Sequence, residues 1–122
     1  MSTENTIVWL DLPVTNLKRA VKFYSAVLGE KVKLRKIPGF EFGLLPHTKD
    51  SVSGCLVKMR GYKPSKTGAV IYFNVDVRHE KAEKAAAKGG KVLQKKHPIG
   101  PHGFRTVILD SEGNRVALHS SP

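Results

Sequence analysis

The chain has 122 residues, of which 40% are hydrophobic and 25% charged, and this globular composition excludes a disordered or fibrous protein. Its 21 Lys and Arg residues outnumber its 10 Asp and Glu residues, giving a formal net charge of +11 that attracts anionic small molecules, nucleic acid or anionic membranes without choosing among them. The single cysteine, Cys55, excludes an intramolecular disulfide and a thiolate metal cluster.

The start of the chain, residues 1–6, is polar and lacks the basic and apolar regions of a signal peptide. No apolar run approaches the ~18 residues that a membrane span requires. We therefore expect a cytoplasmic protein that makes no contact with a membrane.

The first half predicts a strand over residues 7–13, followed by a helix that Thr15 or Asn16 caps and that runs through Leu28. Gly29 supplies the C-terminal stop. The apolar residues of this helix follow the i, i+3, i+4, i+7 spacing of one buried face. They are Leu17, Ala20, Val21, Tyr24, Val27 and Leu28.

Three further strands complete the first half, and a turn-rich segment over 61–68 reads as a linker. The second half then repeats the order of the first. A strand precedes a helix that Asp76 caps and that runs through Lys88, with Glu80 and Lys84 placed as an i, i+4 ion pair. The other predicted strands cover residues 31–37, 40–45, 54–60, 69–75, 91–96, 104–109 and 115–119.

The two halves can be aligned on each other. Residues 29–32 (GEKV) and 89–92 (GGKV) lie 60 positions apart, each between a helix and the next strand. Both halves therefore predict a strand, a helix and three strands. We expect one α+β domain over residues 1–122, built from two βαβββ modules over about 6–60 and 69–120.

Three segments resemble the vicinal oxygen chelate superfamily of glyoxalase, bleomycin-resistance and extradiol-dioxygenase proteins. Residues 7–29 are similar to the family's opening strand and its helix ending in Phe-Tyr, a small spacer and Gly. Residues 68–76 (GAVIYFNVD) and 100–120 (GPHGFRTVILDSEGNRVALHS) are similar to its later strands. The resemblance implies a curved, partly open sheet around a cleft, and chains that commonly associate in pairs.

The resemblance also implies where a metal would bind, because metal-dependent members supply one ligand from each of four strands. Three of those positions fall on Trp9, Val70 and Ala117, and the fourth falls within residues 54–57, which hold Cys55 but no His or carboxylate. Indole, isopropyl and methyl groups have no lone pair for a divalent ion. We therefore expect neither a metal nor another cofactor.

Alternation along the strands predicts which side chains face the cleft. Val8, Leu10 and Leu12 would pack beneath the first helix. His97 and His102 lie in turn-rich stretches and flank a loop over residues 98–101, which would close over a ligand or lie free in solvent. The residues predicted to face the cleft are Trp9, Asp11, Val70, Tyr72, Asn74, Arg115, Ala117 and His119.

Asp11 and His119 are the candidates for catalysis. Asp11 is a carboxylate on an apolar strand, so it suits a general base or a salt-bridge partner of a nearby cation. His119 suits a proton shuttle or an exposed strand-end histidine. His79, in the first turn of the second helix, reads most simply as solvated.

The sequence favours metal-independent binding, or conversion, of a small anionic or aromatic molecule near Trp9, Tyr72 and Arg115. Two alternatives remain: a metal-dependent lyase, isomerase or dioxygenase of glyoxalase type, and a sequestering protein of the drug-resistance kind without catalysis. We expect a homodimer. The basic residues are dispersed and no nucleic-acid motif is present, so we expect no specific nucleic-acid binding, only weak nonspecific affinity at low salt.

Overall fold

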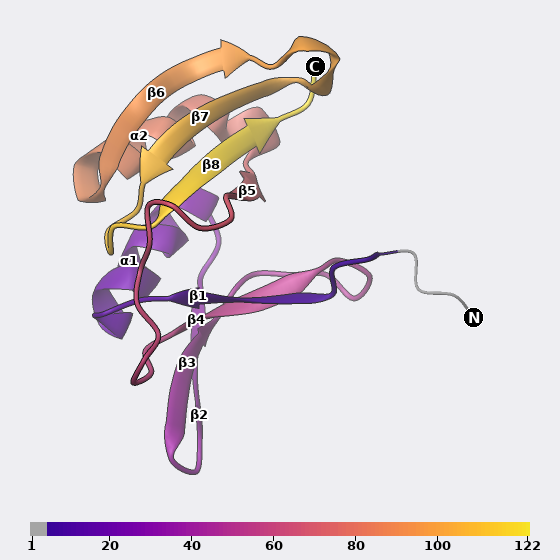
Figure 1. The fold of residues 1–122 in the computed structure, drawn as a ribbon. Helices are drawn as coiled ribbons and strands as arrows, with labels where there is room; N and C mark the ends of the chain where they lie inside the picture. The colour runs from indigo at the N-terminus through magenta and orange to yellow at the C-terminus, as the bar shows by residue number, and fades with distance from the viewer. Residues whose placement is uncertain (1–4) are drawn as a thin grey trace.

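The computed structural model describes residues 5–122, so the first four residues of the polar start lie outside it. The first module contains β1 (Trp9–Pro13), α1 (Leu17–Leu28), β2 (Lys33–Ile37), β3 (Phe40–Leu44) and β4 (Ser53–Val57). The second module contains β5 (Ile71–Asn74), α2 (His79–Gly89), β6 (Lys91–Pro98), β7 (Phe104–Leu109) and β8 (Arg115–Ser120), with short 3-10 turns at Asp76–Arg78 and Gly100–His102 (Figure 1).

Each module forms its own four-stranded sheet, in the order β1-β4-β3-β2 for the first sheet and β5-β8-β7-β6 for the second. The first strand of each module runs parallel to its last strand, and the remaining neighbours are antiparallel. The predicted α+β fold with two βαβββ modules is confirmed. β1 and β5 are not hydrogen-bonded to each other, so the two modules keep separate sheets.

Helix α1 forms where its local signals predict it. The side chain of Asn16 caps the helix by accepting a hydrogen bond from the backbone N–H of Arg19, and Gly29 ends it in the left-handed conformation at φ 74°. The buried face consists of Ala20, Phe23, Tyr24 and Val27, so Phe23 joins the predicted stripe.

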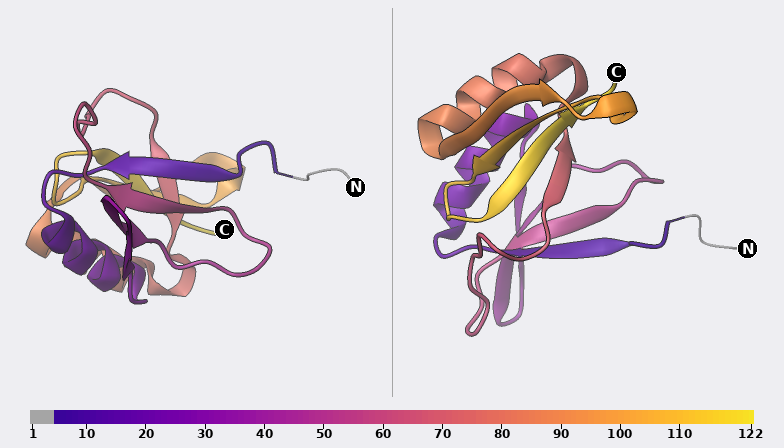
Figure 2. Two further views of the ribbon diagram at one scale, coloured as in Figure 1. Left: turned by 90° about the horizontal axis from the view of Figure 1, so that it is seen from below. Right: turned by 45° about the horizontal axis from the view of Figure 1, so that its top comes forward.

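Helix α2 begins later than predicted. Asp76 does not cap it, because Asp76–Arg78 forms a 3-10 turn and the helix starts at His79. Its buried side chains include the small Ala82 and Ala86, which allow close packing against α1. Figure 2 shows the two helices side by side.

One hydrophobic core joins both modules. Leu12 and Leu56 of the first sheet and Phe73 and Leu118 of the second belong to the same cluster as the buried faces of α1 and α2. Successive side chains on a strand point to opposite faces, so the other face of each sheet is turned away from this core. Val8 was expected to pack beneath α1, but it precedes β1 and is 63% exposed.

Neither helix is both long and apolar enough to cross a membrane within the part of the chain that the structure describes.

Candidate functional site

A row of polar side chains crosses the second sheet on the face turned away from the helices. Asn74 on β5 lies opposite His119 on β8, His119 lies opposite Arg105 on β7, and Arg105 lies opposite His97 on β6. Tyr72 lies on the same face, two residues before Asn74. We call these five residues the polar row. All four strands of the sheet contribute to it.

The Arg105 guanidinium is held on two sides. Its Nε donates to Nε2 of His97 at 3.0 Å, and its Nη1 donates to the hydroxyl oxygen of Tyr72 at 2.7 Å. His97 Nε2 accepts, so the proton of this neutral ring lies on Nδ1, which is 2.7 Å from the carbonyl oxygen of Lys95. The second terminal nitrogen of Arg105 remains available for a ligand.

His119 and Tyr72 also keep hydrogen-bonding capacity. Nε2 of His119 is 2.7 Å from the carbonyl oxygen of His102, so this nitrogen is the donor and Nδ1 of the neutral ring retains a lone pair. The Tyr72 oxygen accepts from Arg105, which leaves its own O–H free to donate. The two rings lie edge to face with centroids 6.3 Å apart. The polar row therefore offers a ligand the N–H groups of Arg105 and the O–H of Tyr72 as donors, and Nδ1 of His119 as an acceptor.

The charge of Arg105 is not balanced by a carboxylate. Among residues 5–122, only Arg19 and Glu112 form an ion pair with a nitrogen–oxygen distance within 4.0 Å, so Arg105 has no such partner. A half-buried guanidinium with free N–H groups and no acidic partner suits a carboxylate or another planar anion.

The corresponding face of the first sheet carries Trp9, Asp11 and Cys55. The indole N–H of Trp9 donates to Oδ1 of Asp11 at 2.9 Å, and the Cys55 thiol donates to the same oxygen at 3.3 Å. Burial, followed by the hydrogen bond and the negative charge of Asp11, raises the pKa of Cys55 to about 12. The thiol is therefore protonated near neutral pH and is a poor nucleophile.

The structure gathers part of the predicted site. Tyr72, Asn74 and His119 lie together, and His102 joins them through its backbone carbonyl. Ala117 pairs with Tyr72 and is fully buried.

The other predicted residues lie elsewhere. Trp9 and Asp11 belong to the first sheet, and Val70 precedes β5. Arg115 lies at the opposite end of β8 from His119. Its backbone N–H donates to the backbone carbonyl oxygen of Ser65.

Sequence reasoning missed Arg105 and treated His97 as a loop residue. The signal for Arg105 was a single cation in the apolar strand FRTVIL. Its importance depends on register, because only the pairing of β7 with β6 and β8 places it between two histidines.

His79 is not solvated, as the sequence suggested, but 2% exposed. Its Nδ1 lies 2.7 Å from Oγ of Ser120 and its Nε2 lies 2.8 Å from Oγ1 of Thr106. These partners come from β8 and β7, far from His79 in the sequence. The residue holds α2 on its sheet and does not face the polar row.

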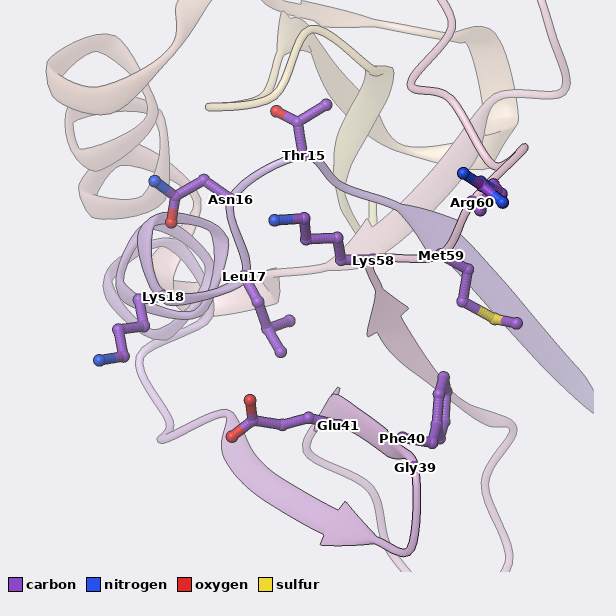
Figure 3. A pocket seen from close by; sticks show the side chains of 10 residues that line it. All are labelled: Thr15, Asn16, Leu17, Lys18, Gly39, Phe40, Glu41, Lys58, Met59 and Arg60. Carbon is purple, nitrogen blue, oxygen red and sulfur yellow. The ribbon is translucent and has the colours of Figure 1, made fainter.

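A separate pocket of about 640 Å³ lies between the start of α1 and the β2–β3 hairpin. Figure 3 shows Leu17, Lys58 and Glu41 on its walls, with Phe40 and Met59 further along. Glu41 adds an acidic side chain to the same lining as Lys58. Protein side chains already occupy part of the helix start there, because Glu112 accepts the backbone N–H groups of Thr15 and Asn16 and the Asn16 side chain accepts that of Arg19. The polar row is therefore the stronger candidate.

The family model of the Glyoxalase/Bleomycin resistance protein/Dioxygenase superfamily matches residues 6–118 of the chain. The chain belongs to this superfamily. A "Glyoxylase-like domain-containing protein" of Didymella fabae is 30% identical over 127 residues, covering 100% of this chain and 98% of that protein.

Solved structures of superfamily members share the fold. A glyoxalase/bleomycin resistance protein from Albidiferax ferrireducens T118 superposes with a TM-score of 0.74 at 16% identity, covering 97% of this chain and 100% of that one. Glyoxalase I from Zea mays superposes with a TM-score of 0.70 at 22% identity, covering 92% of this chain and 44% of that one. This chain thus spans less than half of the maize enzyme.

The positions that the sequence resemblance implies for metal ligands do not fit a divalent ion. They carry the indole of Trp9, which donates to Asp11, and the side chains of Val70 and Ala117. No three His, Cys, Asp or Glu side chains within residues 5–122 are grouped closely enough to hold one ion.

Proposed function

We propose that this superfamily member binds a small anion with an aromatic or conjugated group on the polar row, without a metal ion. The observation that carries the proposal is Arg105, which Tyr72 and His97 hold in place and which no carboxylate neutralises. A fixed guanidinium loses little side-chain entropy on binding, so its hydrogen bonds to an anion stabilise the complex more fully.

Each group of the row has a distinct role in this proposal. The carboxylate or enolate oxygen of the ligand accepts from the free N–H groups of Arg105 and from the O–H of Tyr72. The conjugated part of the ligand lies against the ring of Tyr72, which is 45% exposed. The net charge of +11 favours the approach of the anion and makes binding weaken as salt rises.

We also propose that a second copy of the chain completes the cleft. The face carrying the polar row is turned away from the core of its own chain. Within the chain, Tyr72 and Asn74 line a cavity of about 520 Å³ shared with the first module, and a second copy would supply the wall opposite Arg105, His97 and His119. β1 and β5 each form one edge of their sheet. Ile7 and Val8, next to β1, are 66% and 63% exposed. Unpaired edges with exposed apolar side chains favour association with another chain.

Light scattering tests the dimer. We expect twice the mass of one chain for the unaltered protein, and a lower mass for Val8→Lys because a buried ammonium would disfavour the interface. Val77→Lys is the matched control, since Val77 is 98% exposed on the α2 side. A monomeric unaltered protein would remove the proposal of a second wall.

Calorimetric titration with benzoate and phenylpyruvate tests ligand binding. Replacing Arg105 with Gln should weaken binding by about tenfold or more, the range expected for a hydrogen bond to a charged group. Arg35→Gln, an exposed cation on the first sheet, makes the same charge change and should alter affinity by less than about twofold. A chelator should leave the affinity unchanged. If neither anion binds, or if both variants bind equally, the site is not the polar row.

Proton transfer is the second candidate function, because Nδ1 of His119 keeps a lone pair and the His119 ring lies edge to face with the ring of Tyr72. In this reaction His119 removes a proton from the carbon next to the carbonyl of a bound 2-oxo acid, and Tyr72 and Arg105 stabilise the enolate. Deuterium exchange into phenylpyruvate, faster than in buffer and lost in His119→Gln, would establish catalysis. Binding without faster exchange would indicate sequestration instead.

A further inference from the structure

A groove of about 490 Å³ between α1 and α2 is lined by cations and by no acid. Its cationic residues are Lys22 on α1, Arg78 just before α2, and Lys81, Lys84 and Lys88 on α2. We call these five residues and the floor between them the basic groove. The two helices that form it lie side by side in Figure 2, on the core side of both sheets.

The lysines of the basic groove form no ion pair within the part of the chain that the structure describes. The only ion pair found there joins Arg19 and Glu112, which lie outside the groove. The sequence predicted a pair between Glu80 and Lys84, but no such pair forms within 4.0 Å. Lys81, Lys84 and Lys88 follow i, i+3, i+7 spacing, which places three like charges along one helical face. Among residues 5–122, no ion pair within 4.0 Å offsets the repulsion between these three lysines, so binding of a polyanion would stabilise the fold.

We propose that the basic groove binds the phosphodiester backbone of a nucleic acid without reading its sequence. This activity is separate from the proposed anion site, which lies on the opposite face of the second sheet. A row of lysines suits a chain of phosphates, because each ammonium is a compact charge with three donors that tolerate many geometries.

The floor and the arginine of the groove argue against a peptide ligand. The floor consists of Ala26, Ala85, Gly89 and Phe23, the last only 6% exposed, so it offers no deep pocket for an anchoring side chain. Arg78 donates through Nη1 to the carbonyl oxygen of Val27, so its fork is already engaged and is not free for bidentate binding of a carboxylate. The groove itself is lined by no exposed aromatic ring that could stack on a base, so the contacts are to the backbone alone.

Fluorescence anisotropy with a labelled mixed-sequence DNA duplex tests the proposal. The groove variant replaces Lys81, Lys84 and Lys88 with Gln, which retains helix propensity. The control variant replaces three exposed loop lysines, Lys49, Lys63 and Lys66, with Gln as well, so the net charge changes by the same amount. Affinities are measured between about 50 and 200 mM salt, the range over which phosphate contacts differ most clearly. Thermal unfolding checks that both variants remain folded.

We expect the groove variant to bind at least about tenfold more weakly at low salt and to reduce the slope of log affinity against log salt by about two to three, since each phosphate contact contributes about 0.9 to that slope. The control should change affinity by less than about threefold. Equal losses in both variants, or no binding by the unaltered protein, would overturn the proposal. Displacement of the duplex by polyglutamate of equal charge at equal concentration would also overturn it, in favour of an acidic protein.

Discussion

Glu112, in the turn between β7 and β8, accepts a hydrogen bond of 2.7 Å from Nε of Arg19 on α1, 93 positions earlier in the chain. The same carboxylate accepts the backbone N–H groups of Thr15 at 2.9 Å and Asn16 at 2.8 Å. The first N–H groups around a helix start lack intrahelical partners and carry partial positive charge. A side chain of the second module therefore supports the start of the first helix and connects the two modules.

We predict that Glu112→Gln lowers the free energy of unfolding by about 1.5–3 kcal/mol at pH 7, the range for hydrogen bonds to a charged group. Burial alone would raise the pKa of Glu112, but hydrogen bonds from Arg19, Asn16 and Thr15 outweigh it and lower the pKa from 4.5 to about 2. A lowered pKa stabilises the fold fully above pH 4.5, and this contribution is lost as the pH falls from 4.5 towards 2.

Urea unfolding at pH 7 and near pH 3 measures this difference. The gap between the unaltered protein and Glu112→Gln should shrink at the lower pH. Glu41→Gln is the control, because Glu41 is exposed. A gap that stays constant between the two pH values would show that the charge of Glu112 does not stabilise the fold.

Local signals predicted α1 well, because Asn16, the apolar spacing and Gly29 act within a few residues of one another. The polar row could not be predicted in the same way. Arg105 becomes a site residue only through register, which places His97 and His119 on either side of it. His79 was misjudged for a related reason: its neighbours in sequence are charged, but Ser120 and Thr106, brought by distant strands, make its burial favourable.

The hydrogen bonds of His79 have a fixed direction. Thr106 donates its hydroxyl proton to Oε1 of Glu83 at 2.7 Å, so its oxygen accepts from Nε2–H of His79. Nδ1 of the neutral ring then accepts from Ser120. The resulting chain runs from Ser120 through His79 and Thr106 to Glu83.

We predict that Thr106→Val lowers the free energy of unfolding by about 1–3 kcal/mol, because it leaves the buried N–H of His79 without an acceptor. Thr67→Val, at an exposed position in the linker, should change it by less than about 0.5 kcal/mol. Chemical denaturation of both variants measures the difference. Equal effects would mean that the chain of hydrogen bonds does not stabilise the fold.

Protonation of His79 should destabilise the protein. Burial and then the charge of Lys96 lower its pKa below 6.5, despite the opposing effect of Glu83. The unfolded state therefore binds the proton more readily, and stability is lost as the pH falls below 6.5. A His79→Gln variant should show less of this loss between pH 7 and 5. An identical pH profile in the variant would contradict the prediction.

Removing the Ser53 hydroxyl should leave stability unchanged or raise it by about 0.5–1 kcal/mol. Its Oγ is buried without a hydrogen-bond partner among residues 5–122, beside a cavity of about 520 Å³ between the modules. A desolvated hydroxyl without a partner destabilises the fold, and alanine does not carry that cost. Ser120→Ala provides the contrast, because Ser120 donates to His79 and its loss should be destabilising. Thermal unfolding distinguishes the two, and a clearly destabilised Ser53→Ala would show that the hydroxyl has a partner in solution.

The Cys55 thiol should react slowly with a disulfide reagent in the folded protein at pH 8, because its pKa of about 12 leaves little thiolate. Asp11→Asn removes the neighbouring negative charge, so the pKa falls and the reaction should become about tenfold faster for each unit of that fall. Asp50→Asn, at an exposed loop position, is the control and should leave the rate unchanged. Asp11→Asn also weakens the hydrogen bond that the indole N–H of Trp9 donates to residue 11, so a shift in Trp9 fluorescence emission should accompany the faster reaction. A folded protein that reacts as fast as its urea-unfolded form would show that neither burial nor Asp11 protects the thiol.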